Sequence, residues 1–527
     1  MPGPCSLLWA GHAATARRRY NAKGSLRTSG GAPVSAYLLA IDQGTHASRA
    51  VLFGLDGRVL ANRIVPLKTS CPMPGWVEQD PEEIFLSVVQ ASRDAIRAGR
   101  VDASDIKAIG ITNQRETLVV WERDTGQATA PAIVWQDRRG QEICAELSEA
   151  QASVGLSRRT GLRLDPYFTA SKLAWLVRTR PDLLSAARRG RLQAGTIDSW
   201  LLYRLSGGQI WATEPSNASR TLLYDLDLGT FSQDLLDLFA LPGSLLPSIK
   251  PSAHRFGHTA SDVFGQPLPV TGMLGDQQAA LLGQGCLVAG DVKDTFGTGA
   301  FLLAYTGGEI RHSAHGLLTT VAWDFGSGPT YALEGSVFMA GALLDWLIDL
   351  GIAASPAELD RLALSAPSAH GTVIIPSHQG LGAPWWDAEM RGAIWGLTRS
   401  SGRSELARAA LEAIAQQAAD LTEAIQGDLG QPLRDLRIDG GVARSALLPQ
   451  MLADLSGLSV QRSLDHEATA RGAAMVAAVG AGLLGPGELG PFVGQRETFV
   501  PSLVSDERNE RRTHWRQAVA KARGLKA

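Results

Sequence analysis

The sequence predicts an α/β protein in which two related domains face each other across a central cleft. Three observations support this fold class. The chain has 527 residues, which is more than a single hydrophobic core usually accommodates. Two similar strand-rich segments begin about 250 residues apart, at Tyr37 and at Val292. Between and after them, apolar runs typical of strands alternate with amphipathic runs typical of helices.

Each of these segments contains a strand, a Gly-Thr turn and a returning strand. The first runs from Tyr37 through Asp42-Gln-Gly-Thr, and the second runs from Val292 through Gly297-Thr-Gly. Glycine allows backbone N–H groups to approach phosphate oxygens, so two such hairpins facing each other would bind a polyphosphate from both domains. A purely structural hairpin is the alternative for each. The sequence has no lysine-bearing phosphate loop of the Walker type, so a nucleotide would be bound in another way.

The domain boundary is expected near Gly285, which divides the folded chain into residues 36–285 and 286–527. The run 472–484 is apolar, rich in Ala and Gly, and too short for a membrane span. It predicts a buried, closely packed helix. The pattern also predicts helices over 81–98 and 407–425, and Pro- and Gly-rich connections near 242–252 and 376–384.

Composition excludes several function classes. Hydrophobic residues make up 45% of the chain, charged residues make up 19%, and the net charge is -2, as in an ordinary globular protein. The chain has no excess of basic residues, so its charge does not predict nucleic-acid binding. The cysteines have no paired spacing, so we expect reduced thiols, no cysteine metal site and a cytoplasmic location. They are Cys5, Cys71, Cys144 and Cys286.

Residues 1–35 differ from the rest of the chain. They contain five Lys or Arg and no Asp or Glu, together with much Ala, Gly and Ser. This composition is similar to that of a mitochondrial transit peptide, and the alternative is a disordered extension. In both cases the folded part is expected to begin near Ala36.

A polar stretch, Ile-Thr-Asn-Gln-Arg-Glu-Thr at 111–117, follows an apolar strand. In open α/β sheets, ligands bind in loops at the carboxyl ends of the strands. Arg115 provides a fork of donors beside the acceptor Glu116, and such a pair suits a small neutral molecule rich in hydroxyls. The alternative for an isolated Arg-Glu is an exposed ion pair.

Two further turns carry candidate residues. Gly275-Asp276-Gln277 follows the strand predicted over 269–274 and precedes a helix, so Asp276 is either an N-cap or a cleft carboxylate that accepts a hydroxyl proton. The double glycine after Asp439 would let an adenosine lie against bare backbone, or it forms a simple tight turn. Asp42, at the end of a strand, could hold Mg²⁺.

Taken together, these stretches resemble the glycerol kinases, a branch of the FGGY carbohydrate kinases within the actin-like ATPase superfamily. The matching motifs run in order from Tyr37 to about Ala474, which is nearly all of the expected folded chain. NQRET and APWWD are specific to the glycerol branch, whereas several others occur in sugar kinases generally. The motifs include DQGT, ITNQRET, IVWQDRR, DPYF, NASRT, GDQQAALLGQ, GTGAFLL, LEGSVFMAGA, GLGAPWWD and DGG.

The resemblance implies two duplicated RNase H-like, actin-like ATPase domains and ATP-dependent phosphorylation of glycerol to glycerol 3-phosphate. Asp276 would be the general base, ATP and Mg²⁺ would be required, and Asp42 would lie near the metal. The implied glycerol-binding residues are Arg115, Glu116, Trp135, Tyr167, Asp276, Gln277 and Phe301. The positions implied for ATP binding are Gly44, Thr45, His46, Ala47, Arg49, Thr298, Gly341, Asp345, Gly441 and Ser445.

The chain departs from the family pattern at four of these positions. His46 and Ala47 replace hydroxyl residues in the first hairpin, and we hypothesise that His46 donates to a phosphate. Asp345 replaces a glutamine and Ser445 replaces an asparagine, so the nucleoside preference is open. Residues 260–269 lack the loop that binds a sugar bisphosphate inhibitor in some members, so such regulation is expected to be absent.

Two other functions are compatible with parts of the pattern. One is a kinase for a different polyol or ketose, although the glycerol-type ITNQRET favours glycerol. The other is an actin-like ATP-binding module that polymerises or regulates a partner, which would leave Arg115, Glu116 and Tyr167 without a role. The sequence is compatible with a homo-oligomer but does not specify one.

Overall fold

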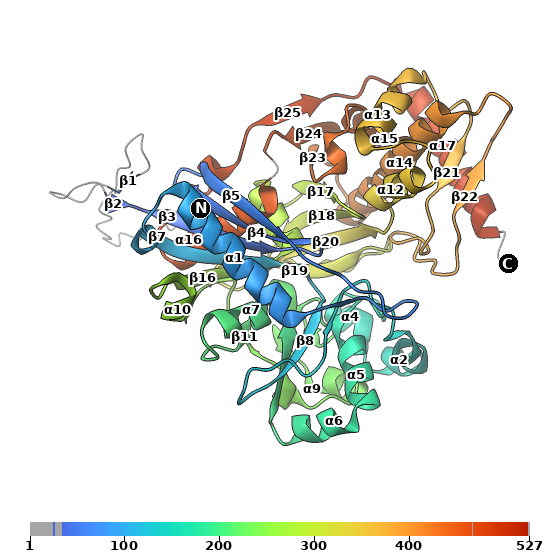
Figure 1. Cartoon of the computed structure of the whole chain (residues 1–527). Helices are drawn as coiled ribbons and strands as arrows, with labels where there is room; N and C mark the ends of the chain where they lie inside the picture. The colour runs from blue at the N-terminus through green and yellow to red at the C-terminus, as the bar shows by residue number, and fades with distance from the viewer. Residues whose placement is uncertain (1–24, 27–33, 466, 525–527) are drawn as a thin grey trace, which may run out of the picture.

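Two mixed β-sheets, each built around an antiparallel hairpin, form the centre of the molecule (Figure 1). The structure, a computed structural model, describes residues 25–26, 34–465 and 467–524. The first sheet has the order β15-β16-β7-β3-β4-β5, and the second has the order β19-β20-β18-β17-β23-β24-β25. The strands of the first sheet are β3 (Tyr37–Gln43), β4 (Ala47–Gly54), β5 (Val59–Pro66), β7 (Ile106–Asn113), β15 (Ala253–His258) and β16 (Pro269–Gly275).

The second sheet repeats the pairing of the first. Its strands are β17 (Val292–Phe296), β18 (Ala300–Gly307), β19 (Leu318–Asp324), β20 (Pro329–Val337), β23 (Asp435–Asp439), β24 (Ser459–Ser463) and β25 (Arg496–Phe499). In each sheet an opening hairpin, β3–β4 or β17–β18, is antiparallel. The first strand of each hairpin then pairs in parallel with a later strand, β3 with β7 and β17 with β23. The duplicated α/β architecture expected from the sequence is confirmed.

A separate small sheet and several short helices form the lower lobe in Figure 1, and all of them except β6 lie between β7 and β16 in the sequence. The sheet has the order β10-β8-β9-β6. These elements support the loops that later form one wall of the central cavity. They are β6 (Glu78–Gln79), β8 (Leu118–Glu122), β9 (Ala132–Ile133), β10 (Leu192–Thr196), α2 (Gln141–Glu146), α5 (Thr169–Thr179), α6 (Pro181–Arg188), α7 (Ile197–Leu205) and α8 (Pro215–Ala218).

Helix α1 (Pro81–Gly99) shows how local chemistry sets an element. Asp80 is the N-cap and accepts a hydrogen bond from the backbone N–H of Glu82, while Pro81 occupies the first turn, where its missing N–H costs nothing. The helix ends at Arg100, which adopts a left-handed conformation with φ 52. The prediction of 81–98 is therefore confirmed to within one residue.

A second group of helices covers the sheet of β17–β25 at the upper right of Figure 1. The longest, α14 (Arg403–Leu429), extends the predicted 407–425 by about one turn at each end and buries its alanine-rich face. The expected connections at 242–252 and 376–384 are largely irregular in the structure. The other helices of this group are α12 (Gly341–Asp349), α13 (Pro356–Ser365), α15 (Leu448–Ser456) and α17 (Ser505–Gly524).

Helices α11 (Asp276–Gly283) and α16 (Ala468–Gly480) pack tightly against each other between the two sheets. The predicted helix over 472–484 is present and buried, shifted four residues toward the N-terminus. Helix α16 lies between β24 and β25 of the second sheet in sequence, yet it packs on β3, β7 and β16 of the first. A boundary at Gly285 remains a prediction, and the first sheet is covered partly by residues that lie beyond it.

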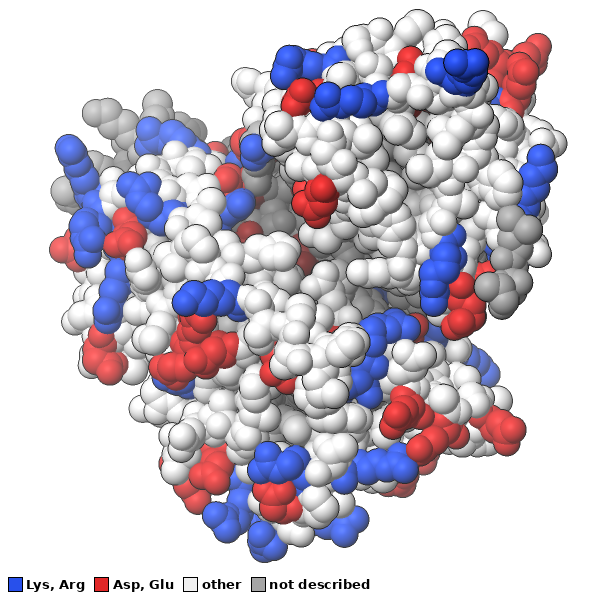
Figure 2. All heavy atoms as spheres, turned by 45° about the vertical axis from the view of Figure 1, so that its right-hand side comes forward, with Lys and Arg blue, Asp and Glu red and all other residues white. Residues whose placement is uncertain are grey.

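Several other expectations concern the termini, thiols and membrane spans. The extension 1–35 falls largely outside the described residues, of which Ser25–Leu26 and Val34–Ser35 form the paired strands β1 and β2. Cys71, Cys144 and Cys286 are free thiols, and Cys5 lies outside the described residues. Among the helices that the structure describes, none is long and apolar enough to cross a membrane. On the face drawn in Figure 2, basic and acidic side chains are interspersed.

We expect Gly472→Ala to destabilise the protein by roughly 1–3 kcal/mol, because overpacking at a tight contact forces the backbone to move. A Cβ at Gly472 would lie 1.9 Å from the backbone oxygen of Ala279 on α11. Urea unfolding measures the loss. Gly487→Ala is the matched control, since a Cβ there meets nothing within 4 Å. Equal midpoints for the two variants would contradict the close helix contact.

Candidate active site

A cavity of about 170 Å³ lies between the two sheets. Its walls come from the turns that follow β3, β7 and β16, from the inserted lobe and from the hairpin β17–β18. All seven residues predicted to bind the substrate line this one space, together with two of the residues predicted to bind ATP, Thr45 and Thr298. The lining residues are Thr45, Arg115, Glu116, Trp135, Tyr167, Asp276, Gln277, Thr295, Gly297, Thr298, Gly299 and Phe301.

Strand pairing brings the key polar residues together although they are far apart in sequence. Strands β7 and β16 are parallel, and Asn113 at the end of β7 pairs with Gly275 at the end of β16. Arg115 and Asp276 therefore emerge from neighbouring carboxyl ends, where open α/β sheets place their ligands. The Nε atom of Arg115 lies 3.2 Å from Oδ1 of Asp276.

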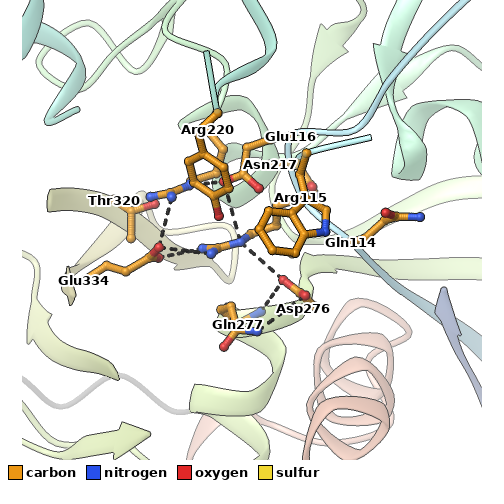
Figure 3. Close-up of polar contacts among 12 residues, drawn as sticks. Gln114, Arg115, Glu116, Asn217, Arg220, Asp276, Gln277, Thr320 and Glu334 are labelled. Carbon is orange, nitrogen blue, oxygen red and sulfur yellow. Dashed lines mark hydrogen bonds and ion pairs between the residues drawn. The ribbon is translucent and has the colours of Figure 1, made fainter. Parts of the chain in front are cut away.

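Arg115 is held from behind by a buried carboxylate of the second sheet, Glu334 on β20 (Figure 3). Nη1 and Nη2 of Arg115 donate to the two oxygens of Glu334 at 2.6 and 3.0 Å. Arg220, which follows α8, donates from Nη2 to Glu334 at 2.9 Å and from Nε to Glu116 at 2.6 Å. Two guanidinium groups and two carboxylates thus form a buried network, of which Arg115 and Glu116 face the cavity.

The charges of this network balance. Burial alone would raise the pKa of Glu334, but Arg115 and Arg220 outweigh it and hold the pKa at about 2. Burial raises the pKa of Asp276, and the guanidinium of Arg115 opposes this only in part. Glu334 is therefore a permanent anion, whereas Asp276 is a more basic carboxylate than an exposed aspartate.

The cleft role of Asp276 is favoured over the capping role. Gly275 occupies the N-cap of α11 and Asp276 is the first helical residue. Its Oδ1 accepts from the adjacent N–H of Gln277 at 2.8 Å, and 29% of its side chain is exposed, in the wall of the cavity. Lys293 donates to Oε1 of Gln277 at 2.5 Å, which turns the amide NH₂ of Gln277 toward Asp276 and leaves it as a donor.

Aromatic rings form the apolar wall of the cavity. Trp135 lies edge-on to Tyr167 and to Phe301, with ring centroids 5.7 and 6.1 Å apart. The indole N–H of Trp135 donates to the hydroxyl of Thr45 at 2.9 Å, which links this wall to the first hairpin. Behind Tyr167, the buried ammonium of Lys172 donates to the carbonyl oxygens of Pro166 and Tyr167 and so fixes the backbone there.

The two predicted phosphate hairpins lie on either side of this space. In the first, the turn at Gly44 is closed by a hydrogen bond from its N–H to Ala47, and the side chain of His46 is exposed. Arg49 pairs with Glu467 at 3.3 Å in this structure. Thr298 of the second hairpin accepts from the backbone N–H groups of residues 340 and 342 at the start of α12.

The double glycine after β23 lies beside the second hairpin. Gly440 has φ +95, and a Cβ there would lie 2.3 Å from the backbone oxygen of Phe296, so the turn requires glycine. Gly441 faces open space, with nothing within 4 Å of a Cβ. The hydroxyl of Ser445 donates to Asp360 and accepts from the N–H groups of residues 447 and 448. Asp345, on α12, is exposed.

The residues around Asp42 fit a magnesium ion that takes most of its other ligands from a bound substrate and from water. Burial raises the pKa of Asp42 to about 7, against the opposing effect of Arg49, and Asp276 adds to the increase. A divalent cation would favour the ionised form. In the part of the chain that the structure describes, no group of three or more His, Cys, Asp or Glu could form a dedicated metal cage. Mg²⁺ commonly takes one or two carboxylates and completes its shell with phosphates and water.

Comparison with known proteins identifies the fold family. The model of the N-terminal domain of the FGGY family of carbohydrate kinases matches residues 37–283, and the model of the C-terminal domain matches residues 293–481. The chain belongs to the FGGY family of carbohydrate kinases. The glycerol kinase of Thermus brockianus is 46% identical over 93% of this chain and 99% of its own length.

Solved carbohydrate kinase structures agree with this assignment. The glycerol kinase of Plasmodium falciparum, solved with ADP, superposes with a TM-score of 0.85 at 31% identity, covering 93% of this chain and 98% of that one. A xylulose kinase from Lactobacillus acidophilus gives 0.83 at 22% identity, covering 93% and 99%. At 22% identity, the likeness to the xylulose kinase shows the fold alone and does not identify the molecule that is phosphorylated.

Sequence reasoning missed three charged residues of this carbohydrate kinase site, Arg220, Lys293 and Glu334. Each lies in a stretch that was noticed, but none was given a role. The available signal was a charged residue inside an apolar strand, as at Lys293 in β17 and Glu334 in β20. Such residues are rarely fully buried unless they are paired.

We expect Ser445→Ala in this kinase to lower stability by about 1 kcal/mol, because the hydroxyl accepts from the backbone N–H groups of residues 447 and 448, which precede and begin α15. The KM for ATP should stay unchanged, since the structure commits the hydroxyl to Asp360 and two amides. Thermal unfolding and initial rates measure the two effects. Ser355→Ala, which removes a cap from α13, is the control. A rise in the KM for ATP in Ser445→Ala but not in Ser355→Ala would instead support the nucleotide contact that the family resemblance implies.

Proposed function

We propose that the chain transfers the terminal phosphoryl group of ATP to a terminal hydroxyl of glycerol, giving glycerol 3-phosphate. The observation that supports this most is the cavity itself, which sets donors and acceptors around a small space between two Gly-Thr hairpins. A triol needs partners that donate and partners that accept, because each hydroxyl does both. The relatives named glycerol kinase support the same acceptor.

In the proposed complex, Asp276 receives a hydrogen bond from the reacting hydroxyl and takes its proton as the new O–P bond forms. Its raised basicity suits this role. Arg115 and the amide NH₂ of Gln277 donate to glycerol oxygens, and Glu116 accepts. Trp135 and Phe301 pack against the carbon chain. Missing hydroxyls would leave buried polar groups unpaired, so discrimination should be strong.

The nucleotide is proposed to lie across the two hairpins, with backbone amides near Gly44 and Thr298 directed at the phosphates. The nucleoside would rest on the open backbone at Gly441. Asp42 would hold Mg²⁺ through water or directly, and the ion would neutralise charge on the phosphates. Phosphoryl transfer of this kind depends on positioning and electrostatic stabilisation rather than on covalent chemistry by the protein.

Exclusion of water is part of the proposal, since water competes with glycerol as the nucleophile. Rotation of the two lobes toward each other would bring both hairpins to the nucleotide and close the space. The buried free thiols Cys144 and Cys286 support a reducing, cytoplasmic compartment.

A kinase for another polyol or a ketose is the second candidate, because a xylulose kinase shares the fold. The small cavity and the residues of the ITNQRET stretch favour glycerol. An ATP-dependent actin-like module is not favoured, because it would not require a buried polar network behind a pocket.

The test is a coupled ADP-release assay with glycerol, dihydroxyacetone, erythritol or xylulose, and with no acceptor. We expect glycerol to give the highest kcat/KM and a phosphate ester to form in equal amount with ADP. Preference for xylulose would move the chain to the ketose kinases. ADP release that ignores every acceptor would support the actin-like module.

We expect Asp276→Asn to lower kcat by roughly 10²–10⁴-fold, the usual contribution of a general base. The change keeps the size of the side chain, so the thermal midpoint should move little. Single-turnover phosphoryl transfer under saturating glycerol and ATP measures the chemical step. Asp349→Asn, at an exposed position of α12 outside the predicted sites, is the control. Near-normal transfer by Asp276→Asn would remove this residue from the proton-accepting role.

A further inference from the structure

The groups that contact the proposed substrate are themselves oriented by a layer of charges behind them. Glu334 has no exposed surface and accepts four hydrogen bonds, two from Arg115, one from Arg220 and a weaker one from Ser336 at 3.4 Å. Arg220 is equally buried and has Glu116 as its second partner. Neither Glu334 nor Arg220 lines the cavity. They act on it only through Arg115 and Glu116.

The hydrogen bonds made by Glu334 and Arg220 determine which atoms of Arg115 and Glu116 remain available to a substrate. Glu334 accepts hydrogen bonds from Nη1 and Nη2 of Arg115, and Gln278 accepts one from Nη1. These bonds direct the Nε edge of Arg115 toward Asp276. Arg220 binds only Oε1 of Glu116, so Oε2 of Glu116 is left as an acceptor. Without Glu334, the guanidinium of Arg115 has two carboxylates within 4 Å, Asp276 at 3.2 Å and Glu116 at 3.9 Å, and it would turn toward them.

We propose that Glu334 and Arg220 are positioning residues that determine which acceptor alcohol the site accepts, by limiting Arg115 to its single Nε contact with Asp276 and leaving one oxygen of Glu116 free. This inference rests on the proposed function and deepens it. Removing either charge leaves its buried partner uncompensated, and that partner would re-pair with the residues that face the substrate. The loss would fall on recognition of the alcohol rather than on ATP binding.

Glu334→Gln tests the inference, because the amide keeps the shape of the side chain and removes its charge. We expect the KM for glycerol to rise about 10²-fold, as for a misplaced binding group, while the KM for ATP changes less than about threefold. The preference for glycerol over 1,3-propanediol, which lacks the central hydroxyl, should fall by a similar factor. Glu334→Asp restores the charge and should recover part of both losses.

Asp420→Asn is the matched control for the loss of a buried charge. Asp420 on α14 is buried, and it accepts from Arg512 and from Trp515 of α17, away from the cavity. We expect it to lower the thermal midpoint without changing the KM for glycerol or the preference over 1,3-propanediol. Arg220→Lys provides a second route to the network if Glu334→Gln does not fold, and it should show the same split between the two KM values.

The outcomes separate this inference from the proposed function. A wild-type protein that fails to phosphorylate glycerol overturns the proposed function itself. An active wild type whose Glu334→Gln and Arg220→Lys variants lose stability, yet keep the KM for glycerol and the diol preference, overturns the positioning role. Equal rises in both KM values would also count against it, since a general distortion of the cleft would affect both substrates.

Discussion

Glu334 on β20 is fully buried, and the structure around it compensates for the cost of burying a carboxylate. Moving a carboxylate out of water costs several kcal/mol unless donors replace the lost solvent. Here the donors are two guanidinium groups, Arg115 after β7 of the other sheet and Arg220 after α8 of the inserted lobe. The two sheets therefore meet at Glu334, and the cavity lies on the other side of Arg115 and Glu116. Packing, charge balance and the position of the site are consequences of the same contact.

The same arrangement recurs around the cavity. Gln277 is oriented by Lys293, and the backbone of Tyr167 is fixed by Lys172. Burial lowers the pKa of Lys172 to about 8, and nearby carboxylates, Glu116 first among them, limit the decrease. These side chains are expensive to bury, and each orients a group that faces the substrate. Preorganisation of this kind removes reorganisation cost from the reaction step.

Much of this molecule could be predicted from local sequence. The two hairpins, the helices α1 and α14, and the polar turns at Arg115 and Asp276 all have local signals. The partners of Arg220 and Glu334 could not be predicted locally, because Glu334 is 219 positions from Arg115 in the chain and only the folded sheets bring them together. The local signal at Glu334 was only a charge inside an apolar strand. Ser445 shows the converse limit. A family position implied a nucleotide contact, whereas the local backbone donates to its hydroxyl, and only coordinates reveal that competition.

Helix α16 has a consequence for how the polypeptide is made. Its alanines and glycines cover a face of the first sheet, but they are synthesised almost 200 residues after the last strand of that sheet. A nascent chain with its first half complete therefore has α1 packed on its first sheet, but the surface of β3, β7 and β16 that α16 covers is still exposed. The packing of the first sheet is therefore completed only after translation passes Gly480.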